Sequence, residues 1–180
     1  MKYFVDLGAY KGQGIKEFYN KQLVENTDDY AIYCFEPQNF DEEWKKIKKE
    51  YKNVCLMKYA AWLFDGKVKF SVAKNNTFYK SGVMKEKIDY GEGKKIMVPC
   101  IDFSRFVCQF KKDYLIVKMD IEGAEFPILE KMIKDNTIQY VDKLFVEWHD
   151  TKMIPPMTDR KYKILEKIKE LKIDYKDWET

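Results

Sequence analysis

The chain has little arginine, one histidine and no long apolar run. No stretch approaches the roughly 18 apolar residues of a membrane-spanning helix. The first residues enter an apolar strand pattern, without the charged, apolar and small-residue regions of a secretory signal. These absences exclude a visible membrane anchor or export signal. We therefore expect a soluble, cytoplasmic protein without a membrane partner.

Arg105 and Arg160 are the only side chains that offer a bidentate fork to a phosphate. The net charge is +3, and lysines are spread over every predicted helix. This distribution is typical of a solvated surface and disfavours a nucleic-acid partner. The four cysteines form no C-x-x-C pair, which favours reduced thiols over a zinc site or a disulfide framework.

A length of 180 residues is sufficient for a single domain, residues 1–180, with one core. Continuous apolar runs alternate with segments of helical spacing, which predicts an α/β fold with a doubly wound, mostly parallel sheet. After the first strand, the predicted strands cover residues 30–37, 53–60, 67–73, 140–148 and 173–178, with another that ends at Asp120. A loop is expected over residues 74–95, as a lid or substrate rim.

The first strand ends in Asp6 and breaks into a turn that contains Gly8 and Gly12. A strand, a glycine turn and a helix N-terminus form a cradle for an anionic or polar cofactor. The spacing differs from the G-x-G-x-x-G of nicotinamide sites and suits S-adenosylmethionine, whose cationic amino-acid end Asp6 would meet directly or through loop amides. The candidate cofactor-binding residues are Asp6, Gly8, Ala9, Tyr10 and Gly12. The alternative is a turn that needs its glycines only for packing.

The second predicted strand ends at Glu36 and Pro37. An acid at this position is placed to accept hydrogen bonds from both ribose hydroxyls of an adenosine. Ala60 and Ala61, at the end of the third predicted strand, are expected to pack against the adenine. Asp120 joins Glu36 and Pro37 as a candidate cofactor-binding residue.

Four further residues are predicted to converge at the carboxyl edge of the sheet: Asp120, Glu122, Glu147 and His149. Glu147 and His149 alternate with period two and so share a face of their strand. A hydroxyl is a weak acid, so its methylation needs a general base, for which His149 is the candidate, or a metal. Asp120, Glu147 and His149 are the alternative ligands for Mg²⁺ or Mn²⁺. A lone histidine is also often structural.

The sequence resembles the FkbM family of methyltransferases. The likeness lies in a V-D-x-G-A-x-x-G turn at 5–12, the Glu36-Pro37 strand end, and a K-x-D-x-E-G-A-E motif at 118–125. The resemblance implies a class I, Rossmann-like methyltransferase fold that uses S-adenosyl-L-methionine, and O-methylation of a hydroxyl, often on a sugar or polyketide. Tyr10 stands where such sequences often have Asn. Against the usual pattern, the fold is expected to be reduced at both termini.

Two other functions stay open from the sequence. An RNA ribose 2'-O-methyltransferase would use a Lys-Asp-Lys-Glu tetrad whose first lysine precedes the first strand, where this chain has only Lys2. A catalytically inactive cofactor-binding subunit is the second alternative. We expect a small-molecule or glycan acceptor, and we leave a homo-oligomer open.

Overall fold

The computed structural model describes residues 1–20, 23–24, 26–73, 81–84 and 94–178. Its main sheet has six strands in the order β3-β2-β1-β7-β8-β9, and every neighbouring pair is parallel. The strands are β1 (Lys2–Leu7), β2 (Tyr30–Phe35), β3 (Val54–Met57), β7 (Tyr114–Met119), β8 (Lys143–Val146) and β9 (Asp174–Asp177). The predicted α/β fold with a mostly parallel sheet is confirmed.

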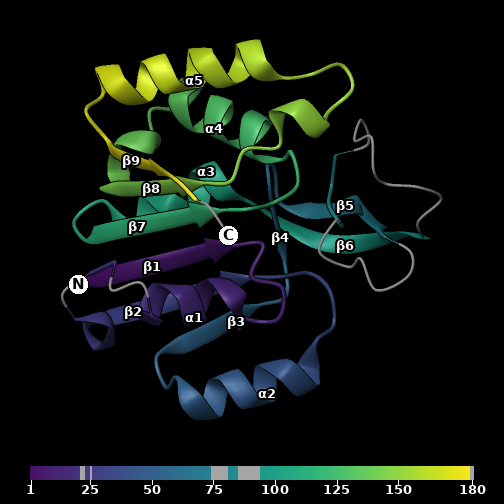
Figure 1. Cartoon of the computed structure of the whole chain (residues 1–180), viewed down its shortest axis with the longest axis vertical. Coiled ribbons are helices and arrows are strands. Elements are labelled where there is room, and N and C mark those ends of the chain that lie inside the picture. The colour runs from purple at the N-terminus through teal and green to yellow at the C-terminus, as the bar shows by residue number, and fades with distance from the viewer. Residues whose placement is uncertain (21–22, 25, 74–80, 85–93, 179–180) are drawn as a thin grey trace.

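Helices cover both faces of this sheet (Figure 1). They are α1 (Gln13–Asn20), α2 (Asp41–Glu50), α3 (Phe103–Phe106), α4 (Glu125–Lys134) and α5 (Thr158–Glu170). Short 3-10 turns lie at η1 (Thr27–Asp29), η3 (Val107–Phe110), η4 (Ile138–Tyr140) and η5 (Asp150–Lys152). None of the helices in the described ranges is long and apolar enough to cross a membrane.

The central strands are buried on both sides, as their continuous apolar sequences predict. In β1, Phe4 packs with α1 and α2, whereas Val5 packs with the core under α3, α4 and α5. In β7, Ile116 and Val117 divide between the same two cores. The alternation of side chains along a strand therefore gives the sheet two separate hydrophobic faces.

A second sheet has the order β4-β6-β5 and lies at the side toward which the arrows of β1 and β7 point (Figure 1). Its strands are β4 (Ala60–Trp62), β5 (Gly66–Val72) and β6 (Lys94–Asp102); β6 runs parallel to β4 and antiparallel to β5. The second sheet therefore stands over the carboxyl edge of the main sheet.

Three sequence predictions need correction here. The predicted strand 53–60 is two strands in different sheets, because β3 ends at Met57 and β4 begins at Ala60. Strand β6 was not predicted, and its first two residues fall inside the predicted loop 74–95. Within that loop Gly82 pairs with Ser71 of β5, and residues 74–80 and 85–93 lie outside the described part of the chain. The strand predicted over 140–148 is shorter, since residue 140 belongs to η4 and β8 covers Lys143–Val146.

Candidate active site

A cleft of about 800 Å³, a volume that includes open solvent, lies between the two sheets. Its floor is the carboxyl edge of β1, β2 and β7, which contribute Gly8, Glu36 and Asp120. Ala60, Ala61 and Phe70 of the second sheet line the opposite wall, and Trp178, which follows β9 of the main sheet, also lines the cleft. Ligands of open α/β sheets bind at this edge, where the strand order reverses between β1 and β7.

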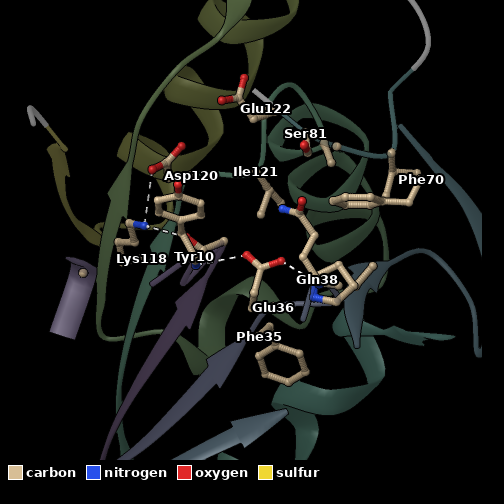
Figure 2. A pocket seen from close by; sticks show the side chains of 18 of the residues that line it. Tyr10, Phe35, Glu36, Gln38, Phe70, Ser81, Lys118, Asp120, Ile121 and Glu122 are labelled. Carbon is tan, nitrogen blue, oxygen red and sulfur yellow. Dashed lines mark hydrogen bonds and ion pairs between the residues drawn. The ribbon is translucent and has the colours of Figure 1, made fainter. Parts of the chain in front are cut away.

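Glu36 is a buried acid at the floor of the cleft, with a side chain that the backbone holds in place (Figure 2). Its Oε2 accepts a hydrogen bond from the Tyr10 N–H at 3.0 Å, and its Oε1 accepts one from the Gln38 N–H at 2.8 Å. Only 4% of the residue is exposed. Burial raises the pKa of Glu36 to about 7, although the two backbone N–H groups lower it. The Glu36 carboxyl therefore gains or loses its proton near neutral pH when no ligand is bound.

The glycines of the first turn are needed for packing. Gly8 has a φ of +79°, and a Cβ there would lie 1.8 Å from the carbonyl oxygen of Asp120. Gly12 has a φ of +81°, and its Cβ would meet the side chain of Ile47 at 2.7 Å. Gly8 lines the cleft, but Ala9 and Gly12 are not among the described residues that line it. The packing interpretation therefore explains Gly12, and contacts of Ala9 and Gly12 with the cofactor stay predictions.

Asp6 does not face the cleft, contrary to one of the two predicted roles. It is completely buried, and its Oδ1 lies 3.0 Å from Nζ of Lys118. The Lys118 ammonium also lies 3.5 Å from Oδ2 of Asp120 and donates to the Gly8 carbonyl at 3.4 Å. Burial lowers the pKa of Lys118, but the carboxylates of Asp6 and Asp120 outweigh it and hold that pKa above its usual value. Asp6 thus pairs with the Lys118 ammonium, which also contacts the residues just after β1 and β7.

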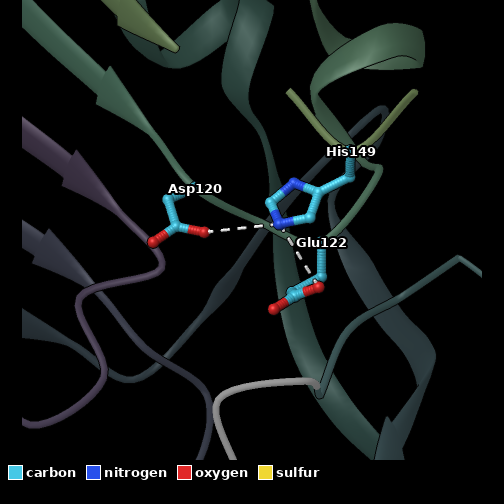
Figure 3. A group of neighbouring side chains, drawn as sticks. All are labelled: Asp120, Glu122 and His149. Atoms are coloured by element: carbon cyan, nitrogen blue, oxygen red, sulfur yellow. Dashed lines mark ion pairs between the residues drawn. The ribbon is translucent and has the colours of Figure 1, made fainter. Parts of the chain in front are cut away.

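The four acids and the histidine beyond β7 and β8 form one group. His149 is 1% exposed, and its Nε2 lies 3.4 Å from Glu122 and 3.9 Å from Asp120, the two acids drawn with it in Figure 3. The same Nε2 lies 3.7 Å from Glu147. Its Nδ1 lies 3.1 Å from Oε1 of Glu125. Asp120 and Glu122 line the cleft directly, whereas His149 and Glu147 are not among the described residues that line it. The structure thus brings the four predicted catalytic residues together, while their roles stay predictions.

The residues that suit a metal differ from the predicted set. In the described part of the chain, Asp120, Glu122 and His149 each offer one ligand atom within 4.8 Å of the others. Glu122 therefore takes the place that the prediction gave to Glu147. Burial, then the neighbouring Asp120, raises the pKa of Glu147.

The comparisons with known proteins agree with this geometry. The family model for the methyltransferase FkbM domain matches residues 6–174. This chain belongs to the FkbM methyltransferase family. The crystal structure of Methyltransferase FkbM from Methylobacillus flagellatus KT is similar in fold, with a TM-score of 0.54 and 14% sequence identity. The similarity covers 92% of this chain and 37% of that one, so the chain spans well under half of that protein's length. A search of curated proteins finds no match.

Membership of the FkbM family implies the use of S-adenosylmethionine, and the residues of the cleft fit this cofactor. A buried carboxylate at the end of β2 is a suitable acceptor for a ribose diol. Pro37, Ala60 and Ala61 add apolar surface to the same cleft. Of the predicted cofactor-binding residues, those that line the cleft are Gly8, Tyr10, Glu36, Pro37, Ala60, Ala61 and Asp120.

Sequence reasoning missed Lys118 and Glu125 as residues of the site. Both belong to the K-x-D-x-E-G-A-E motif, but neither was assigned a function. Lys118 lines the cleft, and Glu125 is completely buried beneath it. A lysine within a continuous apolar strand run was the available signal, because a buried charge requires a partner.

Proposed function

We propose that this protein is an S-adenosylmethionine-dependent O-methyltransferase that acts on a hydroxyl of a small-molecule or glycan acceptor. One observation carries the proposal. A single cleft connects the buried Glu36 carboxylate, suited to an adenosine, with Asp120 and Glu122, which lie within 3.9 Å of His149. The two halves of a methyl-transfer site, one for the donor and one for the acceptor, therefore adjoin.

Glu36 is the residue that would hold the donor. Hydrogen bonds to a charged acceptor stabilise a complex by roughly 1.5–3 kcal/mol, more than the 0.3–1 kcal/mol of a helix dipole. The two backbone bonds at Glu36 fix the orientation of its carboxylate without using all of its lone pairs. When bound, S-adenosylmethionine supplies a methyl group that its sulfonium has already activated.

The acceptor side must remove a proton from a hydroxyl. The geometry supports His149 as the general base, since its Nε2 is grouped with Asp120 and Glu122 at the cleft wall. A divalent metal is the second candidate, because two carboxylate oxygens and one imidazole suit Mg²⁺ or Mn²⁺. In that case Asp120, Glu122 and His149 would hold the metal, whose positive charge would lower the pKa of the acceptor hydroxyl.

A nucleic-acid acceptor has less support. Both arginines are already engaged: Arg105 pairs with Asp65 at 2.5 Å, and Arg160 pairs with Glu130 at 2.6 Å. Phosphate contacts would make binding steeply dependent on salt. RNA binding that weakens with increasing salt would revive the ribose methyltransferase alternative.

The deciding experiment measures release of S-adenosylhomocysteine from the purified protein against a panel of sugars and small alcohols. Each acceptor is tested with a chelator and after Mg²⁺ or Mn²⁺ is restored. Release with at least one hydroxyl acceptor supports the proposal. Binding of S-adenosylmethionine without any turnover would favour the inactive partner subunit, and failure to bind it would refute the cofactor assignment.

A further inference from the structure

Glu125 makes three hydrogen bonds from a completely buried position at the first residue of α4. Its Oε1 accepts from the Ile121 N–H at 2.8 Å, and its Oε2 accepts from the Gly123 N–H at 2.7 Å. The third bond joins Oε1 to Nδ1 of His149 at 3.1 Å. One carboxylate thus contacts both the loop after β7 and the imidazole.

These bonds determine where the imidazole proton lies. Each oxygen of Glu125 already accepts a backbone N–H, so the carboxylate presents an acceptor to Nδ1, and Nδ1 is the donor of the third bond. In a neutral imidazole the other nitrogen is then an acceptor. The Nε2 lone pair of His149 therefore faces the oxygens of Asp120, Glu122 and Glu147. The atom of His149 that would accept the proton of an acceptor hydroxyl is therefore Nε2.

The same carboxylate holds a strained loop. Glu122 has a φ of 60° and Gly123 a φ of 100°, so two consecutive residues occupy the left-handed region. For a residue with a Cβ this conformation costs about 1–3 kcal/mol and persists only where surrounding contacts impose it. The bonds from Ile121 and Gly123 to Glu125 bracket Glu122 and supply such contacts.

We propose that Glu125 is a positioning residue that fixes His149 in the tautomer with its proton on Nδ1, so that Nε2 is the acceptor atom of the site. The importance of this tautomer for catalysis rests on the proposed function, whereas the hydrogen bonds from which we infer it do not. The simpler role for Glu125 is an acid in the first turn of α4, where the helix dipole favours negative charge. That role predicts no effect on the tautomer of His149.

Because His149 is the only histidine of the chain, its two ring nitrogens can be read without assignment. We would record long-range ¹⁵N–¹H correlation spectra of the labelled full chain near pH 9, above the ordinary range of imidazole protonation. The expected wild-type result is a protonated Nδ1 and an unprotonated Nε2. A proton on Nε2, either alone or as an imidazolium, would overturn the proposal even if the protein is a methyltransferase.

The variant Glu125→Gln tests the cause. Its amide presents either an oxygen or an NH₂ group to Nδ1, so we expect the single tautomer to become a mixture. Glu130→Gln is the matched control, because Glu130 lies on the same helix and binds Arg160 at the exposed side. An unchanged tautomer in folded Glu125→Gln would overturn the proposal. Should this variant fail to fold, the wild-type spectrum still tests the claim.

An activity measurement completes the test. Residues that orient a functional imidazole typically alter activity by about 10–100-fold when replaced. We expect Glu125→Gln to lower kcat by that factor with unchanged affinity for S-adenosylhomocysteine, and Glu130→Gln to have neither effect. If no acceptor is turned over by the wild type, the proposed function fails while the spectra still decide the role of Glu125.

Discussion

The pKa of Glu36 gives the sharpest test of the donor site. Burial raises it to about 7, whereas the unperturbed value is 4.5. Hydrogen bonds donated by a ribose diol favour the ionised carboxylate. Affinity for an adenosine ligand should therefore increase with pH up to about 7 and then level off. About one pH unit below this pKa only about a tenth of the carboxyl is ionised, so the affinity should be about tenfold lower, or about 1.4 kcal/mol.

The stability of the protein should change in the opposite direction. A carboxyl whose pKa is higher in the folded than in the unfolded state stabilises the fold below the unfolded pKa. This contribution is lost as the pH increases from 4.5 through about 7. The difference of about 2.5 pKa units corresponds to about 3 kcal/mol. The ionised form of Glu36, which the proposed adenosine site requires, is thus the form that the apo fold disfavours.

Calorimetric titration with adenosine measures the first effect, because adenosine has no group that titrates near neutrality. Buffers of different ionisation enthalpy would reveal the proton that Glu36 releases on binding. Denaturant unfolding of the wild type and of Glu36→Gln, compared across pH, isolates the second effect. Equal affinity one pH unit below and one above the pKa, or wild-type affinity in Glu36→Gln, would refute the assignment of Glu36 to the ribose.

Three further predictions follow. His149→Ala should abolish methyl transfer and leave cofactor affinity unchanged by calorimetry, and near-normal turnover would discard the base role. That role also predicts that chelation of divalent metals does not alter turnover; a loss that Mn²⁺ restores would identify a metal site instead. Lys118→Met should lower the free energy of unfolding by about 3–5 kcal/mol, since it leaves Asp6 buried without its partner, and Asp6→Asn should recover most of this loss in the double variant. In the same unfolding assay the exposed Lys167→Met should change stability by less than about 0.5 kcal/mol, and a comparable loss there would contradict the argument.

The main sheet was predictable because burial on both faces leaves a continuous apolar run. Strands β2 and β7 show this pattern clearly, and the acids that follow them reach the same edge because the strands are parallel. Strand β6 lacks this pattern: Lys95, Met97 and Pro99 are exposed on one of its faces. Its partners β4 and β5 also precede it by a long stretch of chain, so local sequence carries little information about the pairing.

The sequence could not distinguish which strand-end acid faces the cleft. Asp6 lies inside β1, paired in register with Cys34 and Lys118, so its side chain is enclosed between strands and α1. Glu36 comes directly after the last residue of β2, where the chain leaves the sheet. Asp6 precedes the last residue of β1 and Glu36 follows the last residue of β2, so a difference of two positions separates a buried ion pair from an acid that lines the cleft. Register of this kind is fixed by the assembled sheet.

Residues other than glycine with positive φ fall into two groups, those that end a helix and those that line the cleft. In the described part of the chain, four residues other than glycine have positive φ: Tyr10, Glu122, Asn136 and Lys172. Asn136 and Lys172 lie just beyond the ends of α4 and α5, where the left-handed conformation ordinarily terminates a helix. Tyr10 and Glu122 have no such explanation, and both line the cleft. Strain that is kept only around a ligand-sized cleft is expected where a site must be held in one geometry, which is the reason to look there for methyl transfer.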